Sequence, residues 1–249
     1  MKMARYQVIL AYDGTDFQGS QRQAKHRTVQ GELEKSLRKL GWAGKSVILA
    51  GRTDTGVHAT GQVAAFDLDW AHTDEQLLKA LNAELPLDMA VKSLCATSLD
   101  FHPRFDATRR RYCYRLFCEP IRDPLREKFA WRVWPAVDEN ALKASADFFI
   151  GTHDFAAFGS PTTPKGTTVR TVTKAGWKKR PEGEWQFEVQ ADAFLYRMVR
   201  RLVFVQVSLA QGKCSGEEVR SALKKQASLP AGLAPAHGLT LVEVTYGSR

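Results

Sequence analysis

The chain has 249 residues, of which 44% are hydrophobic and 25% are charged, so it can bury the core of one large domain or two smaller ones. No apolar run approaches transmembrane length, and the apolar stretch before Asp13 is too short for a signal peptide. The four cysteines form no C-x-x-C pair and have no histidine at zinc-ligand spacing. We therefore expect reduced, buried thiols and a cytoplasmic location.

The net charge of +9 is unevenly distributed. Residues 1–103 carry 12 Lys and Arg against 12 Asp and Glu, whereas residues 104–249 carry 24 against 15. We therefore predict a neutral N-terminal half at 1–103 and a basic C-terminal half at 104–249. A basic domain favours a polyanionic partner, nucleic acid ahead of a membrane, and the alternative is a basic protein without such a partner.

The first half predicts the order β-α-β-β-α-β, the split βαβ or ferredoxin-like unit. Its expected elements are a strand at 6–12, a helix at 28–40, strands at 46–50 and 61–68, a helix opened by a capping box at Thr73 and Gln76, and a strand at 89–95. Within the first helix, Val29, Leu33, Leu37 and Leu40 fall on one face, the pattern of a helix packed on a core.

The second half repeats this order more loosely. Its expected elements are a strand at 109–118, a helix at 138–149, strands at 169–178 and 184–191, helices at 195–211 and 216–226, and a strand at 238–246. The predicted fold class is therefore α+β. Two ferredoxin-like halves would share a mostly antiparallel central sheet, with helices packed against it and a catalytic cleft between the halves.

The segment from Gly51 to Ala59 is the most informative in the chain. It places Asp54 between two glycines on the loop joining two predicted strands, with Arg52 two residues earlier. A nearby cation favours the charged form of a carboxylate. We therefore expect Asp54 to be ionised and suited to attack or to charge stabilisation, rather than to proton donation.

Two other interpretations of this segment stay open. Glycine, aspartate and threonine also make ordinary turns. The tripeptide Asp54-Thr55-Gly56 also matches the signature of aspartic proteases, in which two carboxylates share one proton. The chain has no second Asp-Thr-Gly, so such a protease would have to be a homodimer, and Arg52 argues against it by keeping both carboxylates ionised.

Two basic segments of the second half are candidates for RNA contact. In residues 109–115, Tyr112 lies among arginines, an arrangement suited to stacking on a base, and the alternative is a buried tyrosine on a strand with solvated arginines. In the helix predicted at 195–211, Arg197, Arg200 and Arg201 fall opposite the apolar stripe. They could follow phosphates, pair with an active-site carboxylate, or form a solvated face.

The sequence lacks the motifs of metal sites, serine hydrolases and nucleotide-binding enzymes. The six histidines show no ligand pattern, and His58 is the one near Asp54 in sequence. There is no G-x-S-x-G, P-loop or dinucleotide-binding motif. The sequence therefore favours chemistry without a metal or an organic cofactor.

Taken together and in order, several segments resemble the TruA-type tRNA pseudouridine synthases. They are Tyr12–Thr15 with Phe17 and Gly19, Thr28–Gly31 with Leu33 and Glu34, Gly51–Ala59 with Gln62, Phe101–Phe105, Arg111–Tyr114, His153–Phe155, Phe194–Leu195 with Met198–Arg200, and His237–Leu239. They span nearly the whole chain. Two positions depart from the family pattern: Ser20 stands where tryptophan is usual, and Pro103 where alanine is usual.

The resemblance implies that the chain converts uridine to pseudouridine in the anticodon stem-loop of tRNA, as a homodimer and without metal or cofactor. It implies that Asp54 is the catalytic residue and that Tyr112 contacts the target base. Arg52 and Arg200 would form the electrostatic frame around Asp54. The alternatives are a non-catalytic tRNA-binding or tRNA-folding protein and, more remotely, the homodimeric aspartic protease.

Overall fold

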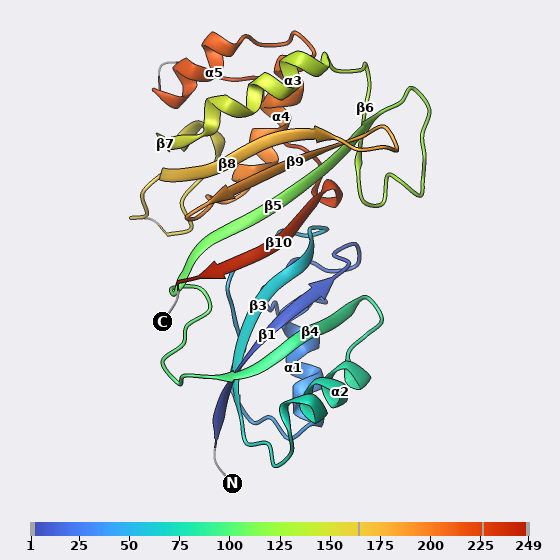
Figure 1. The fold of residues 1–249 in the computed structure, drawn as a ribbon, viewed down its shortest axis with the longest axis vertical. Helices are drawn as coiled ribbons and strands as arrows, with labels where there is room; N and C mark the ends of the chain where they lie inside the picture. The colour runs from blue at the N-terminus through green and yellow to red at the C-terminus, as the bar shows by residue number, and fades with distance from the viewer. Residues whose placement is uncertain (1–2, 164, 226, 248–249) are drawn as a thin grey trace. The chain divides into compact units, whose positions relative to one another are not determined.

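The computed structural model describes residues 3–163, 165–225 and 227–247, which form two compact units (Figure 1). Unit 1 comprises Met1–Thr108 and Leu241–Arg249, and unit 2 comprises Arg109–Thr240. This division differs from the halves expected at 1–103 and 104–249, because the chain from Leu241 onward, with most of the last strand, belongs to unit 1. Pairing between strands so far apart in the chain leaves no local trace in the sequence.

Unit 1 has the predicted β-α-β-β-α-β order. Its elements are β1 (Ala4–Tyr12), α1 (Val29–Lys39), β2 (Ile48–Leu49), β3 (His58–Leu68), α2 (Asp74–Glu84) and β4 (Met89–Thr97). β1 pairs antiparallel with β3 and with β4, and β2 pairs antiparallel with β3. The final strand, β10 (Leu239–Tyr246), lies beside β3.

The helices of unit 1 begin where their capping residues predict. Thr28 accepts a hydrogen bond from the Gly31 amide at the start of α1, and the predicted capping box of Thr73 and Gln76 opens α2. Val29, Leu33 and Leu37 are completely buried, as the helical spacing predicts. Burying three such side chains contributes roughly 1.5–3 kcal/mol each and fixes the face that α1 presents to the core.

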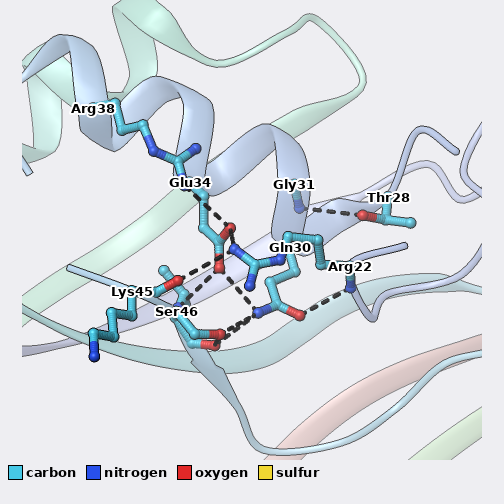
Figure 2. A network of polar contacts seen from close by, with 9 residues as sticks. Arg22, Thr28, Gln30, Gly31, Glu34, Arg38, Lys45 and Ser46 are labelled. Atoms are coloured by element: carbon cyan, nitrogen blue, oxygen red, sulfur yellow. Dashed lines mark hydrogen bonds and ion pairs between the residues drawn. The ribbon is translucent and has the colours of Figure 1, made fainter. Parts of the chain in front are cut away.

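A buried carboxylate joins α1 to the segment that precedes β2. Glu34 accepts hydrogen bonds from the Val47 amide (3.0 Å) and the Gln30 side chain (3.0 Å), and its second oxygen lies 2.6 Å from Arg22 (Figure 2). The Glu34 side chain has no exposed surface. A buried charge is tolerated only when it is paired and hydrogen-bonded. This network therefore fixes α1 against the chain that leads to the Asp54 loop.

Unit 2 is also α+β with a mostly antiparallel sheet, which confirms the predicted fold class. Its elements are β5 (Ala107–Cys118), β6 (Trp131–Val133), α3 (Glu139–Ser145), β7 (Gly151–Asp154), β8 (Val169–Lys179), β9 (Glu184–Ala191), α4 (Met198–Ala210) and α5 (Gly216–Leu223), with the first two residues of β5 belonging to unit 1. β5, β9, β8 and β7 pair antiparallel in this order, and β6 pairs parallel with β5.

Several expected boundaries in unit 2 are wrong. The helix expected from residue 195 starts at Met198, because Arg197 has a left-handed backbone (φ 62°) that cannot continue a helix. The helix expected at 138–149 becomes a 3-10 helix at Ala146–Phe149. The short strands β6 and β7 were not expected. α5 ends at Leu223, and residue 226, where its end was expected, lies outside the described residues.

The cysteines also depart from expectation. All four are free thiols, but Cys95 is exposed and Cys113, Cys118 and Cys214 are half-buried, so the expectation of buried thiols is wrong. Within the described ranges, no helix has both the length and the apolar character needed to cross a membrane.

Candidate active site

One buried side chain, that of Gln62, anchors the start of the Asp54 loop. β2 runs beside β3, with Ile48 opposite Ala65, and the loop leaves β2 at residue 50. The Gln62 side chain accepts a hydrogen bond from the Gly51 amide (3.2 Å) and donates one to the Gly51 carbonyl (2.9 Å). Gln62 is completely buried, so water does not compete for these bonds. The loop therefore starts from a fixed point.

Thr53, the residue before Asp54, is held by two further residues. Its amide donates to the Ser20 hydroxyl (2.8 Å), and its carbonyl accepts from the Ser20 amide (3.0 Å). Its hydroxyl lies 2.9 Å from the Tyr12 hydroxyl. Burial raises the pKa of Tyr12, so its phenol is neutral and available for this bond.

The far side of the loop is fixed by a close approach between backbones. The Val57 amide donates to the Asp54 carbonyl (3.1 Å) and closes a turn. A Cβ atom on Gly14 would lie 2.1 Å from the Val57 carbonyl oxygen, so the residue at position 14 must be glycine. His58 accepts from the Gly14 amide through Nδ1 (2.9 Å) and is buried. His58 thus supports the loop from inside the protein.

Asp54 and Arg52 differ in exposure although they lie on the same loop. Asp54 is half-buried and Arg52 is exposed. Thr53 before Asp54 and Val57 after it are buried and hydrogen-bonded, so the Asp54 carboxylate is carried by a backbone with little freedom. Such a preorganised carboxylate can attack an electrophilic carbon or stabilise a cationic centre without the entropic cost of first ordering the loop.

Tyr112 lies on β5 of unit 2 opposite Val189 of β9. The residue is 9% exposed, and its ring meets the Phe194 ring edge to face, with 5.1 Å between ring centroids and an interplanar angle of 88°. Side chains alternate along this strand, because Tyr112 and Tyr114 are buried while Cys113 and Arg115 are half-buried. The Tyr112 ring is therefore held in place by its neighbours.

The arginines near α4 do not form a solvated stripe. Arg200 donates through Nε to the Ala234 carbonyl (2.8 Å), and Arg201 donates to the carbonyls of Pro230 (2.5 Å) and Gly232 (2.9 Å). Arg197 precedes the helix and is exposed. Arg201 therefore binds and stabilises the backbone of the 229–232 segment.

The predicted site residues fall into two groups. Arg52 and Asp54 share one loop of unit 1, while Tyr112 and Arg200 belong to unit 2. Sequence reasoning missed Tyr12 and Ser20 as supports of the loop and assigned no role to Gln62, since tertiary hydrogen bonds have no periodic signal. Among the described residues, no group of three or more His, Cys, Asp or Glu side chains could hold a metal ion.

Comparison with known proteins decides the family. The sequence model of the tRNA pseudouridine synthase family matches residues 8–106 and 146–247. The chain belongs to this family. It is 39% identical to the tRNA pseudouridine synthase A of Chloroflexus aurantiacus over 96% of this chain and 87% of that protein. It is 41% identical to the protein of the same name from Maridesulfovibrio salexigens (98% and 91% covered) and 38% identical to that of Shouchella clausii (98% and 94%).

A solved structure titled "Crystal Structure of a Cbf5-Nop10-Gar1 Complex" covers 95% of this chain and 48% of its own, with a TM-score of 0.35 and 11% identity. That likeness is too weak to argue from. The match to the family model includes the whole Asp54 loop, since residues 51–57 lie inside the first matched range.

Proposed function

We propose that this protein isomerises uridine to pseudouridine in tRNA, with Asp54 as the catalytic carboxylate. The observation that carries the proposal is the membership in the tRNA pseudouridine synthase family over both matched ranges. The geometry supports it, because Asp54 is presented on a loop held by Gln62 and by the contacts of Thr53. The aspartic-protease alternative has no comparable support.

The reaction fits a single carboxylate without an energy source. The bond between N1 of uracil and C1′ of ribose breaks, and a bond between C5 and C1′ forms. The hydrogen on C5 leaves as a proton, and N1 gains one, so atoms and charge balance. An ionised Asp54 would either attack the nucleoside and later leave, or stabilise a cationic ribose.

The remaining site residues have roles in the same proposal. The target uridine must leave the base stack, at a cost of a few kcal/mol. Tyr112 would pack against the extruded base and keep the detached uracil in place. Arg52, which is exposed, and Arg200 would supply positive charge near Asp54 and the RNA backbone. The substrate would be the anticodon stem-loop of tRNA, bound by a homodimer in the cytoplasm.

Release of tritium from tRNA carrying C5-tritiated uridine tests the proposal. We expect the wild type to release tritium and Asp54→Asn to lose at least ~10³-fold of the single-turnover rate, because the amide is neither nucleophilic nor charged. Asp69→Asn, at an exposed carboxylate of the same unit, is the matched control and should keep the wild-type rate.

Two results would contradict the proposal. Normal tritium release by Asp54→Asn would exclude Asp54 as the catalytic group. A wild type that binds tRNA but releases no tritium would favour the non-catalytic tRNA-binding protein.

A further inference from the structure

Ser20 is a buried residue whose amide, carbonyl and hydroxyl are all engaged. Its carbonyl accepts from the Gln30 amide at the start of α1 (3.0 Å), and its amide donates to the Thr53 carbonyl (3.0 Å). Its hydroxyl accepts from the Thr53 amide (2.8 Å), and the residue has no exposed surface. Ser20 therefore forms a direct bridge from α1 to the residue that precedes Asp54.

The α1 end of this bridge is itself fixed. The Gln30 side chain accepts from the Arg22 amide (2.9 Å) and donates to Glu34 (3.0 Å) and to the Val47 carbonyl (3.1 Å). Figure 2 shows these bonds converging on the first turns of α1. Because Glu34 is completely buried and paired with Arg22, this end of the helix is a rigid reference point. Through its bonds to Gln30 and to Thr53, Ser20 ties the Asp54 loop to this fixed end of α1.

The other side of Thr53 is held independently. The Tyr12 hydroxyl lies 2.9 Å from the Thr53 hydroxyl, and Tyr12 is buried on β1. Ser20 therefore fixes the Thr53 backbone while Tyr12 fixes its side chain. A residue held from two directions has little freedom to rotate, and the peptide bond that follows it carries Asp54.

We propose that Ser20 is a positioning residue for catalysis, acting with Tyr12 through Thr53 to set the direction of the Asp54 carboxylate. The inference rests on the proposed function, since it assumes that Asp54 is the catalytic group. Without the Ser20 hydroxyl, the Thr53 amide would be left without a partner in a closed site, and the loop would shift to find one. A displacement of about 1 Å at a reacting group can cost ~10²-fold in rate.

The experiment compares two buried serines of the same unit. Ser20→Ala removes the acceptor of the Thr53 amide. Ser36→Ala is the control, because Ser36 on α1 is also buried and its hydroxyl bonds only a backbone carbonyl, that of Glu84 (3.0 Å). We expect both variants to lower the melting temperature by a similar few °C.

The catalytic readouts separate the two variants. Ser20→Ala should lose ~10–100-fold of the single-turnover rate of tritium release with tRNA affinity unchanged within about twofold. Ser36→Ala should retain the wild-type rate. A wild-type rate in Ser20→Ala, or an equal loss in Ser36→Ala, would overturn the inference.

Two further measurements keep the inference testable. If Ser20→Ala does not fold, Tyr12→Phe replaces it, since it removes one hydroxyl and keeps the ring; an unchanged rate there would refute the two-sided hold on Thr53. If the wild type releases no tritium, the proposed function fails separately. Hydrogen exchange of the Thr53 amide then tests the Ser20 contact by itself, which requires protection in the wild type and faster exchange in Ser20→Ala; equal exchange in the two proteins would refute that contact.

Discussion

The environments of Cys113 and Cys95 should give them very different reactivity. Burial raises the pKa of the Cys113 thiol to about 11, so at pH 8 only about one molecule in a thousand carries the reactive thiolate. Cys95 on β4 is exposed. We expect iodoacetamide at pH 8 to modify Cys95 in the native protein and Cys113 only after unfolding, as measured by peptide mass spectrometry. Equal modification of both cysteines in the native state would contradict the difference between the half-buried Cys113 and the exposed Cys95.

The sequence points to the proposed catalytic residue more readily than to the residues that hold its loop. Asp54 stands out because a carboxylate between glycines is a local pattern, visible within seven residues. Tyr12, Ser20 and Gln62 support the loop from other parts of the chain, and their roles depend on distances that only the fold creates. Ser20 illustrates this limit: the sequence marked it as a departure from the family, and the structure shows what its hydroxyl bonds.

At the scale of secondary structure, contact between β3 and β10 depends on a glycine. A Cβ atom on Gly61 would lie 2.1 Å from the Val242 carbonyl oxygen and 2.8 Å from its carbon, both backbone atoms that cannot rotate away. We expect Gly61→Ala to push β10 from β3 and to lower the free energy of unfolding by roughly 1–3 kcal/mol or more. Urea denaturation followed by circular dichroism measures this change.

The control for this substitution is a strand glycine with open space around it. A Cβ atom on Gly176 of β8 would meet nothing within 4 Å, so Gly176→Ala should leave the urea midpoint unchanged or slightly raised. If Gly61→Ala were as stable as the wild type, the close packing of β10 against β3 would be wrong.

Long elements with a regular pattern were predictable, and short ones were not. β1, α1, α2, β5 and β9 carry several turns of helical spacing or many residues of alternation, and their observed bounds lie within a few residues of the expected ones. β6 and β7 have three and four residues, too few for a period to be visible. α4 begins late because of the backbone conformation of Arg197, which residue type alone does not reveal.

At the scale of the whole molecule, several arginines of the basic half are held by contacts within the protein and are less available for RNA. Arg115 lies 2.6 Å from the nearly buried carboxylate of Glu184, and Arg132 lies 3.1 Å from Glu127. Arg201 donates to backbone carbonyls. These side chains stabilise unit 2 internally. Arg109, at the start of unit 2, is exposed and better placed for a phosphate.

This difference predicts how salt should affect tRNA binding. Each phosphate contact contributes about −0.7 to −0.9 to the slope of log affinity against log salt, since binding releases condensed counterions. We expect the affinity of the wild type to fall at least tenfold between about 50 and 200 mM salt, as measured by filter binding. Arg109→Gln should make the slope shallower by about one contact.

Arg115→Gln is the matched control on the same strand. It should leave the slope unchanged while lowering stability, because it removes a partner of the nearly buried Glu184. A flat salt response in the wild type would remove the case for an RNA partner based on charge. A shallower slope in Arg115→Gln than in Arg109→Gln would show that the internally paired arginine, and not the exposed one, meets the phosphates.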